Sequence, residues 1–142
     1  MRKFVMCFCI LLITFSLVAC KERSTLDDVI VDIEGSTKFE EKDIEKAVNC
    51  VKDNFSFPGS TLKKLWYDEE ESNLFIEGYL NNGKGSINGV SPENVIVLLS
   101  NFHVDGSGDN PVLNPNTTYT DYKWILIRED KTGDWIVDDC GY

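Results

Sequence analysis

The chain has 142 residues, of which 24 are acidic and 14 basic, and 42% are apolar, so length and composition fit one domain with a hydrophobic core. A formal net charge of −10 argues against a nucleic-acid partner, because the phosphate backbone would be repelled. Three of the five cysteines lie within the first twenty residues, which sets this segment apart from the rest.

The N-terminal segment has the pattern of an export signal. Arg2 and Lys3 precede an apolar run that covers residues 4–18. A helix of that length rises about 22 Å, which is short of the roughly 30 Å hydrocarbon core of a bilayer. We therefore predict a signal peptide over residues 1–19 rather than a transmembrane span.

The signal ends at a motif that favours lipidation. Leu17-Val18-Ala19-Cys20 resembles the lipobox of bacterial lipoprotein precursors, in which the Cys thiol is linked to diacylglycerol and the chain is cut just before it. The resemblance implies a diacylglyceryl or palmitate anchor at Cys20, on the extracytoplasmic face of the cell membrane. The alternative is an ordinary thiol after a signal anchor. Because Arg2 and Lys3 leave with the signal, the mature chain would carry a formal charge of −12.

Two cysteines remain after Cys20. Cys50 and Cys140 are an even pair in a chain that we expect to be exported, which suggests a disulfide. The alternative is two separate thiols that behave as small apolar residues.

The mature chain reads as a tether followed by one domain. Residues 20–38 are interpreted as the lipidated Cys and its tether, although Val29–Ile33 is apolar enough to add an edge strand. Residues 39–55 carry a helical period, because Ile44, Ala47, Val48, Val51 and Phe55 share one face. Pro58-Gly59 ends this unit.

The remaining segments are interpreted as strands. They are residues 62–68, 74–80 after an acidic turn at 69–73, 95–104, and a hairpin formed by 122–129 and 134–142. Residues 81–92 and 105–121 are interpreted as loops. The fold predicted for residues 39–142 is α+β, with one N-terminal amphipathic helix packed on a curled antiparallel sheet of four to five strands.

Several motifs of residues 39–142 resemble a domain of unknown function found in lipoproteins of Gram-positive bacteria. They are Asp43-Ile44-x-x-Ala47, Trp66-Tyr67-Asp68-Glu69-Glu70, Asn94-Val95-Ile96-Val97, and the ending Trp124-x-Leu126-x-Arg128 … Gly133-x-Trp135-x-Val137-Asp138-Asp139-x-Gly141-Tyr142. The resemblance implies a cystatin-like or nuclear transport factor 2-like fold, and it supplies no catalytic residues. Relatives often carry Trp where this chain has Cys140, so a Cys50–Cys140 bridge would be a local feature.

The candidate contact residues come from one strand end and the loop after it. His103 is the single His, and it lies on the strand face of Val97, Leu99 and Asn101. If that face turns inward, His103 could meet a carboxylate; otherwise it points to water. The long loop makes Asp105, Asp109, Tyr119 and Tyr122 candidates for a ligand or partner contact.

Other patterns have plain structural readings. The run Asp105–Asn110 is similar to the start of a calcium loop, but Asn110 and Asn116 stand where Gly and Glu are needed, so a solvated loop is the better account and no metal is predicted. The acidic run 68–71 could bind a cation or keep a hairpin tip soluble. Trp66, Trp124 and Trp135 could build the core or line an apolar pocket.

We therefore expect a membrane-anchored lipoprotein with a non-catalytic binding domain, no cofactor, and an unknown protein or small-molecule ligand. The alternatives are an enzyme that pairs His103 with a carboxylate, and an inhibitor or immunity-like protein.

Overall fold

The computed structural model describes residues 28–142, so the predicted signal peptide and Cys20 lie outside the described residues. Helices and strands run in the order β1 (Ile30–Ile33), α1 (Glu41–Asn54), β2 (Ser60–Tyr67), α2 (Glu69–Asn82), α3 (Gly85–Asn88), the 3₁₀ turn η2 (Pro92–Asn94), β3 (Val95–Val104), β4 (Thr117–Ile127) and β5 (Ile136–Gly141). Within residues 28–142 no helix is long and apolar enough to cross a membrane.

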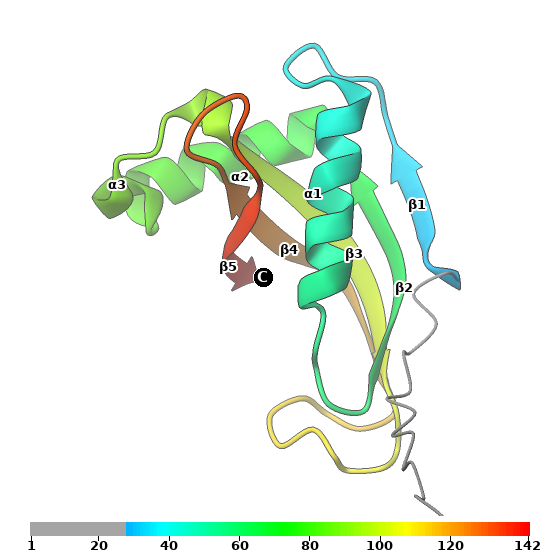
Figure 1. The fold of residues 1–142 in the computed structure, drawn as a ribbon. Helices are drawn as coiled ribbons and strands as arrows, with labels where there is room; N and C mark the ends of the chain where they lie inside the picture. The colour runs from blue at the N-terminus through cyan, green and yellow to red at the C-terminus, as the bar shows by residue number, and fades with distance from the viewer. Residues whose placement is uncertain (1–27) are drawn as a thin grey trace, which may run out of the picture.

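The five strands form one curled sheet in the order β1-β2-β3-β4-β5 (Figure 1). Three of the four strand pairs are antiparallel, but β1 runs parallel to β2, so the expectation of an antiparallel sheet is wrong at this edge. The last part of the predicted tether therefore belongs to the sheet. Val29 before β1 and Phe39 after it are both buried, and their burial stabilises the pairing of this short strand with β2.

Helix α1 lies within the segment for which the apolar period predicts a helix. Its side chains Ile44, Ala47, Val48 and Val51 are all buried and pack on one face of the sheet. Alternate residues of β3 meet this helix, among them Ile96, Leu98 and Phe102. The main core of the domain is this α1 face.

Helix α2 replaces an acidic turn and a strand that the sequence predicts over residues 69–80. Asp68 caps the helix by accepting a hydrogen bond from the Glu71 backbone N–H at 2.8 Å, and three glutamates fill the first turn, where the helix dipole favours them. The buried residues Ser72, Ile76 and Tyr79 follow the helical period. They pack on Val95 and Val97, which face away from α1, so the two helices cover opposite faces of β3.

The loop predicted over residues 105–121 is shorter than expected, because β4 begins at Thr117. Asp121 interrupts β4 with a β-bulge: β3 pairs Ser100 with Tyr122 and Phe102 with Tyr119, so three steps on β4 oppose two on β3. Asp121 has φ 56° and its backbone N–H donates to the Asn101 side chain at 3.1 Å. The loop predicted over residues 81–92 likewise contains α3.

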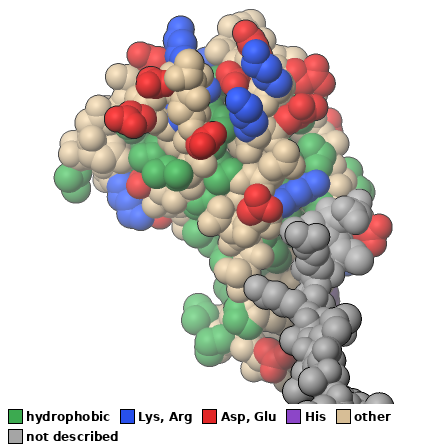
Figure 2. Space-filling model, viewed as in Figure 1, with side chains coloured by type: hydrophobic (Ala, Val, Ile, Leu, Met, Phe, Trp, Pro, Cys, Tyr) green, Lys and Arg blue, Asp and Glu red, His purple; other side chains and the backbone are tan. Residues whose placement is uncertain are grey.

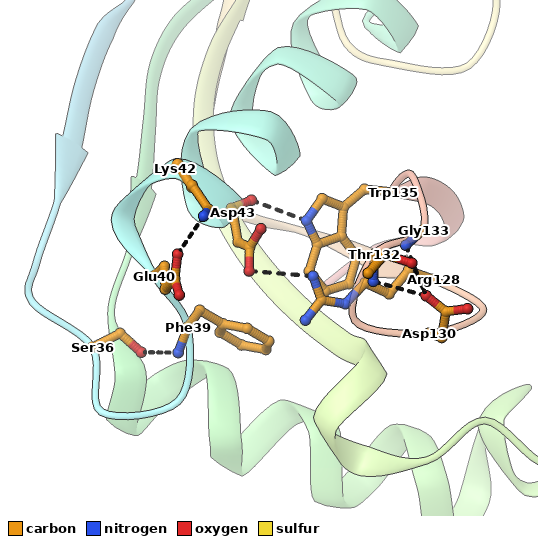
Figure 3. A network of polar contacts seen from close by, with 10 residues as sticks. All are labelled: Ser36, Phe39, Glu40, Lys42, Asp43, Arg128, Asp130, Thr132, Gly133 and Trp135. Atoms are coloured by element: carbon orange, nitrogen blue, oxygen red, sulfur yellow. Dashed lines mark hydrogen bonds and ion pairs between the residues drawn. The ribbon is translucent and has the colours of Figure 1, made fainter.

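The start of α1 is joined to the β4–β5 hairpin by Arg128, a buried cation. Its guanidinium lies 3.3 Å from the Asp43 carboxylate and stacks over the Trp135 ring at 4.4 Å (Figure 3). The Trp135 indole N–H also donates to the Asp43 carbonyl at 2.9 Å (Figure 3). These contacts hold the turn between β4 and β5 against the start of α1.

Candidate functional site

An aromatic cluster covers the α1 face of the sheet beyond the end of α1. Phe102 and Trp124 are buried at its base. Three half-buried rings pack over them, and the Tyr142 ring at the edge of the cluster is 67% exposed. We call the outer set, Phe57, Tyr119, Tyr122 and Tyr142, the aromatic surface.

The rings of the aromatic surface are in direct contact. Tyr119 stacks on Phe102 with centroids 5.2 Å apart, and Tyr122 meets Tyr142 edge-on at 5.4 Å. Phe57 lies 5.7 Å from Tyr122. The bulge at Asp121 makes this possible, because residues three apart on a regular strand point to opposite faces.

Polar groups fix two of these tyrosines. The Tyr119 hydroxyl accepts a hydrogen bond from the Asn114 backbone N–H at 2.9 Å. The Tyr122 hydroxyl donates to the Cys140 sulfur at 3.5 Å. Burial raises the pKa of Tyr122, and contact with Cys140 raises it further, so this hydroxyl keeps its proton at neutral pH.

A carboxylate borders the aromatic surface. Asp121 lies in the bulge between Tyr119 and Tyr122, next to the aromatic surface. Burial raises the pKa of Tyr142, and the neighbouring Tyr119 and Asp121 add to the effect. Asp121 is exposed and has no ion-pair partner among residues 28–142. Asp139 pairs with Ile125 on the α2 face of the sheet, and its carboxylate is 3.6 Å from Lys84.

The other predicted contact residues lie at the same end of the sheet but not on the aromatic surface. The His103 ring Nδ1 is 3.0 Å from the Thr118 hydroxyl, on the strand face turned away from α1. Asp105 accepts from the Ser107 hydroxyl and from the Ser107 backbone N–H at 2.9 Å, and these bonds lower the pKa of Asp105. Asp109 is exposed in the same loop. Tyr119 and Tyr122 are thus the two predicted residues that the fold brings together.

Cys50 and Cys140 are both free thiols, so the predicted bridge is absent. The Cys50 thiol donates to the Trp135 carbonyl at 3.2 Å, which places it at the start of β5. Cys140 lies five residues further along the chain, and an extended strand covers about 17 Å in that distance. A disulfide needs Cα atoms within about 7 Å of each other.

The acidic run and two of the tryptophans singled out in the sequence are part of the framework of the fold. The acidic run 68–71 forms the first turn of α2 instead of a hairpin tip. Trp124 and Trp135 are buried in the core. No group of three or more His, Cys, Asp or Glu side chains within residues 28–142 is arranged to hold a metal ion.

Sequence reasoning missed Tyr142, Phe57 and Asp121 as parts of one surface. Tyr142 is the last residue of the ending that carries the family resemblance, which was the available signal for it. Phe57 belongs to the loop after α1, and its place depends on how that loop folds back on β3 and β4.

Comparison with known proteins places the chain in a family but supplies no activity. Residues 35–141 match the family described as a domain of unknown function, DUF4829. No curated protein matches the chain. No solved structure matches it either. The match covers three quarters of the chain, from the end of β1 to the last strand, so the protein belongs to this family of domains of unknown function.

Proposed function

We propose that the protein is a lipid-anchored binding module on the extracytoplasmic face of the membrane, and that its aromatic surface holds a positively charged group of a partner. The anchor is supported by the Leu17-Val18-Ala19-Cys20 motif at the end of the signal pattern. The binding role is carried by one observation: three tyrosine rings gather around the bulge that carries the exposed Asp121.

The chemistry of this surface favours a cation. Aromatic rings carry partial negative charge on their faces, so an ammonium or guanidinium group is attracted to them. Asp121 adds a full negative charge at the exposed bulge between Tyr119 and Tyr122. The net negative charge of the chain would draw a basic partner toward it from a distance.

The surroundings of His103 support a binding role rather than an enzymatic one. One ring nitrogen contacts the Thr118 hydroxyl, and the nearby Asp105 carboxylate is engaged by Ser107. His103 also lies on the opposite strand face from the aromatic surface. The pairing of an acid and a base that the enzyme hypothesis needs is therefore not supported by this geometry.

We further propose that the family is one of Gram-positive lipoproteins and that the fold is cystatin-like or nuclear transport factor 2-like. Support for this fold comes from a single helix, α1, lying across one face of a curled sheet (Figure 1). The parallel strand β1 and helix α2 would be additions to that plan.

The proposed contact is tested by calorimetric titration of the full chain, in neutral detergent, with a short arginine-rich peptide. Tyr142→Ala and Asp121→Asn each remove one exposed part of the surface. Because an exposed cation–π contact is worth about 0.5–1 kcal/mol, Tyr142→Ala should weaken binding about two- to fivefold. An exposed ion pair is worth about 0.2–1 kcal/mol, so Asp121→Asn should weaken it by up to about fivefold. Asn accepts the positive φ of position 121, so the fold should tolerate it.

The matched control is Glu129→Gln, which removes one exposed carboxylate at the opposite end of β4. It should leave the affinity nearly unchanged. Equal weakening by Asp121→Asn and Glu129→Gln would mean that the peptide senses only net charge, and the aromatic surface would not be the site.

A further inference from the structure

The two ends of the sheet differ in the chain segments that they carry. At one end β2 begins, β3 ends and β4 begins, because Ser60 pairs with Val104 and Val104 pairs with Thr117, whereas β1 begins opposite the middle of β2. The loops at this end are joined to each other. The Asp105 backbone N–H donates to the Gly59 carbonyl at 2.8 Å, and the Asn110 side chain donates to the Pro58 carbonyl at 3.2 Å. We call residues 55–60 and 105–116 the loop pole.

Charge is distributed unevenly between the two ends. The loop pole contains two acidic residues and no Lys or Arg. The opposite end, residues 34–45 and 128–134, contains eight acidic residues and four basic ones. Figure 2 shows charged side chains crowded over the upper part of the molecule. The lower part in this view consists mostly of uncharged polar and hydrophobic atoms.

The loop pole also carries an exposed apolar side chain. Val112 is 84% exposed, and the neighbouring Leu113 packs against the core. The Asn110 side chain accepts from the backbone N–H groups of both residues, at 3.0 and 2.8 Å, so this turn is held in shape. An ordered, exposed apolar side chain can contact the boundary between headgroups and acyl chains.

The number of residues between Cys20 and β1 allows the proposed anchor to reach this side. Nine residues separate Cys20 from Ile30, so an extended connection reaches at most about 34 Å. Ile30 pairs with Lys64, four residues from the start of β2, which is about 13 Å from the loop pole. The loop pole thus lies within reach of lipids that hold Cys20, and β1 runs away from it toward the charged end.

From these observations we infer that the loop pole faces the membrane, with Val112 in contact with the lipid headgroups and the acidic end turned outward. This orientation rests on the proposed lipid anchor. The anchor supplies the affinity, and the charge difference sets the orientation, because an anionic bilayer repels the acidic end more than the loop pole. The occupant of the loop pole is the lipid surface rather than another protein.

The test compares two positions of nearly equal exposure. Val112 is 84% exposed at the loop pole and Ile87 is 88% exposed on α3, away from it. Val112→Cys and Ile87→Cys are made separately in the full chain, with Cys50→Ser and Cys140→Ser. Each protein is purified from membranes, labelled with an environment-sensitive fluorophore, and reconstituted in phosphatidylglycerol–phosphatidylethanolamine vesicles that contain headgroup-nitroxide lipids. Intact mass confirms that one fluorophore is attached.

The orientation predicts that nitroxide lipids quench the label at position 112 several-fold more than the label at position 87. Equal quenching, or stronger quenching at position 87, in a chain that stays with the vesicles would overturn the orientation and leave the anchor standing. A chain that does not stay with the vesicles would contradict the anchor, and the orientation would fall with it.

Discussion

Glu69 is the side chain that ties the segment between β1 and α1 to the rest of the domain. Its carboxylate accepts hydrogen bonds from the Thr37 backbone N–H at 2.8 Å, from the Thr37 hydroxyl at 2.6 Å, and from the Ser36 hydroxyl. These bonds, with the Ser36 hydroxyl contributing most, lower the pKa of Glu69 to about 2. Glu69 in the first turn of α2 therefore has two roles: it complements the helix dipole, and it fixes the connection between β1 and α1.

Glu69→Gln should lower the free energy of unfolding by about 1 kcal/mol at neutral pH, because charge-assisted hydrogen bonds are replaced by weaker ones in a largely solvated place. The folded pKa lies below the ordinary value of 4.5, so the stabilisation is complete above pH 4.5 and declines as the pH falls toward 2. Urea unfolding of both proteins across this pH range checks the effect. Glu70→Gln is the control, because Glu70 is exposed in the same helical turn and should change little. Equal loss of stability in both variants would point to the helix dipole alone.

Tyr119 and Tyr122 lie on one strand face, and this placement shows what can and cannot be predicted from the sequence around each residue. Both residues are apparent from the sequence as aromatic candidates in a long segment without regular pattern. Their presence on one strand face depends on the bulge at Asp121, which is held by the Asn101 side chain of a neighbouring strand. A bulge supported by a residue twenty positions away has no local signature, so the aromatic surface could not be assembled from the sequence.

Among the misassigned elements, α2 is the helix for which the sequence predicts a turn and a strand instead. Its apolar residues are compatible with a strand as well as a helix, and Gly78 in its middle weakens a helix prediction. The decisive interactions are the Asp68 cap and the packing of Ile76 and Tyr79 on the second face of β3. Helix α1 was easier to predict, because all of its buried residues belong to one helical stripe.

Leu74 and Ile76 provide a test of α2 itself. In a strand, residues two apart share a face, whereas in α2 Ile76 is 4% exposed and Leu74 is 66% exposed. Ile76→Ala should therefore lower the free energy of unfolding by about 2–4 kcal/mol, and Leu74→Ala by less than about 0.5 kcal/mol. Equilibrium denaturation of the two variants measures the difference. Similar losses would favour the strand over the helix.

The edge strand β1 shows why the boundary between tether and domain could not be predicted from the sequence alone. Its apolar residues suggest a strand, but Ile30 is 64% exposed, and nothing in the four residues specifies a parallel partner. The pairing with β2 becomes favourable because Val29 and Phe39, before and after the strand, are buried against the core. The boundary between tether and domain is thus set by contacts outside the strand.

At the scale of the whole molecule, the two proposed contact surfaces adjoin at one end of the sheet. The aromatic surface lies on the α1 face and shares Phe57 with the loop pole, which lies at the end where β2 begins. The acidic residues gather toward the other end. A molecule held at the membrane by Cys20 would present the aromatic surface next to the loop pole, with the exposed Tyr142 ring as the part most open to a partner.

Lipid attachment at Cys20 decides both the proposed location of the protein at the membrane and the proposed orientation of its domain. Cells that express the full chain are grown with radiolabelled palmitate, and the label on the protein is measured in the wild type, in Cys20→Ala and in Cys9→Ala. Cys9 lies within the predicted signal and serves as the matched control. If Cys20 carries the lipid, the wild type and Cys9→Ala are labelled equally and Cys20→Ala is not labelled. A Cys20→Ala protein labelled like the wild type would show that the lipid is not attached there.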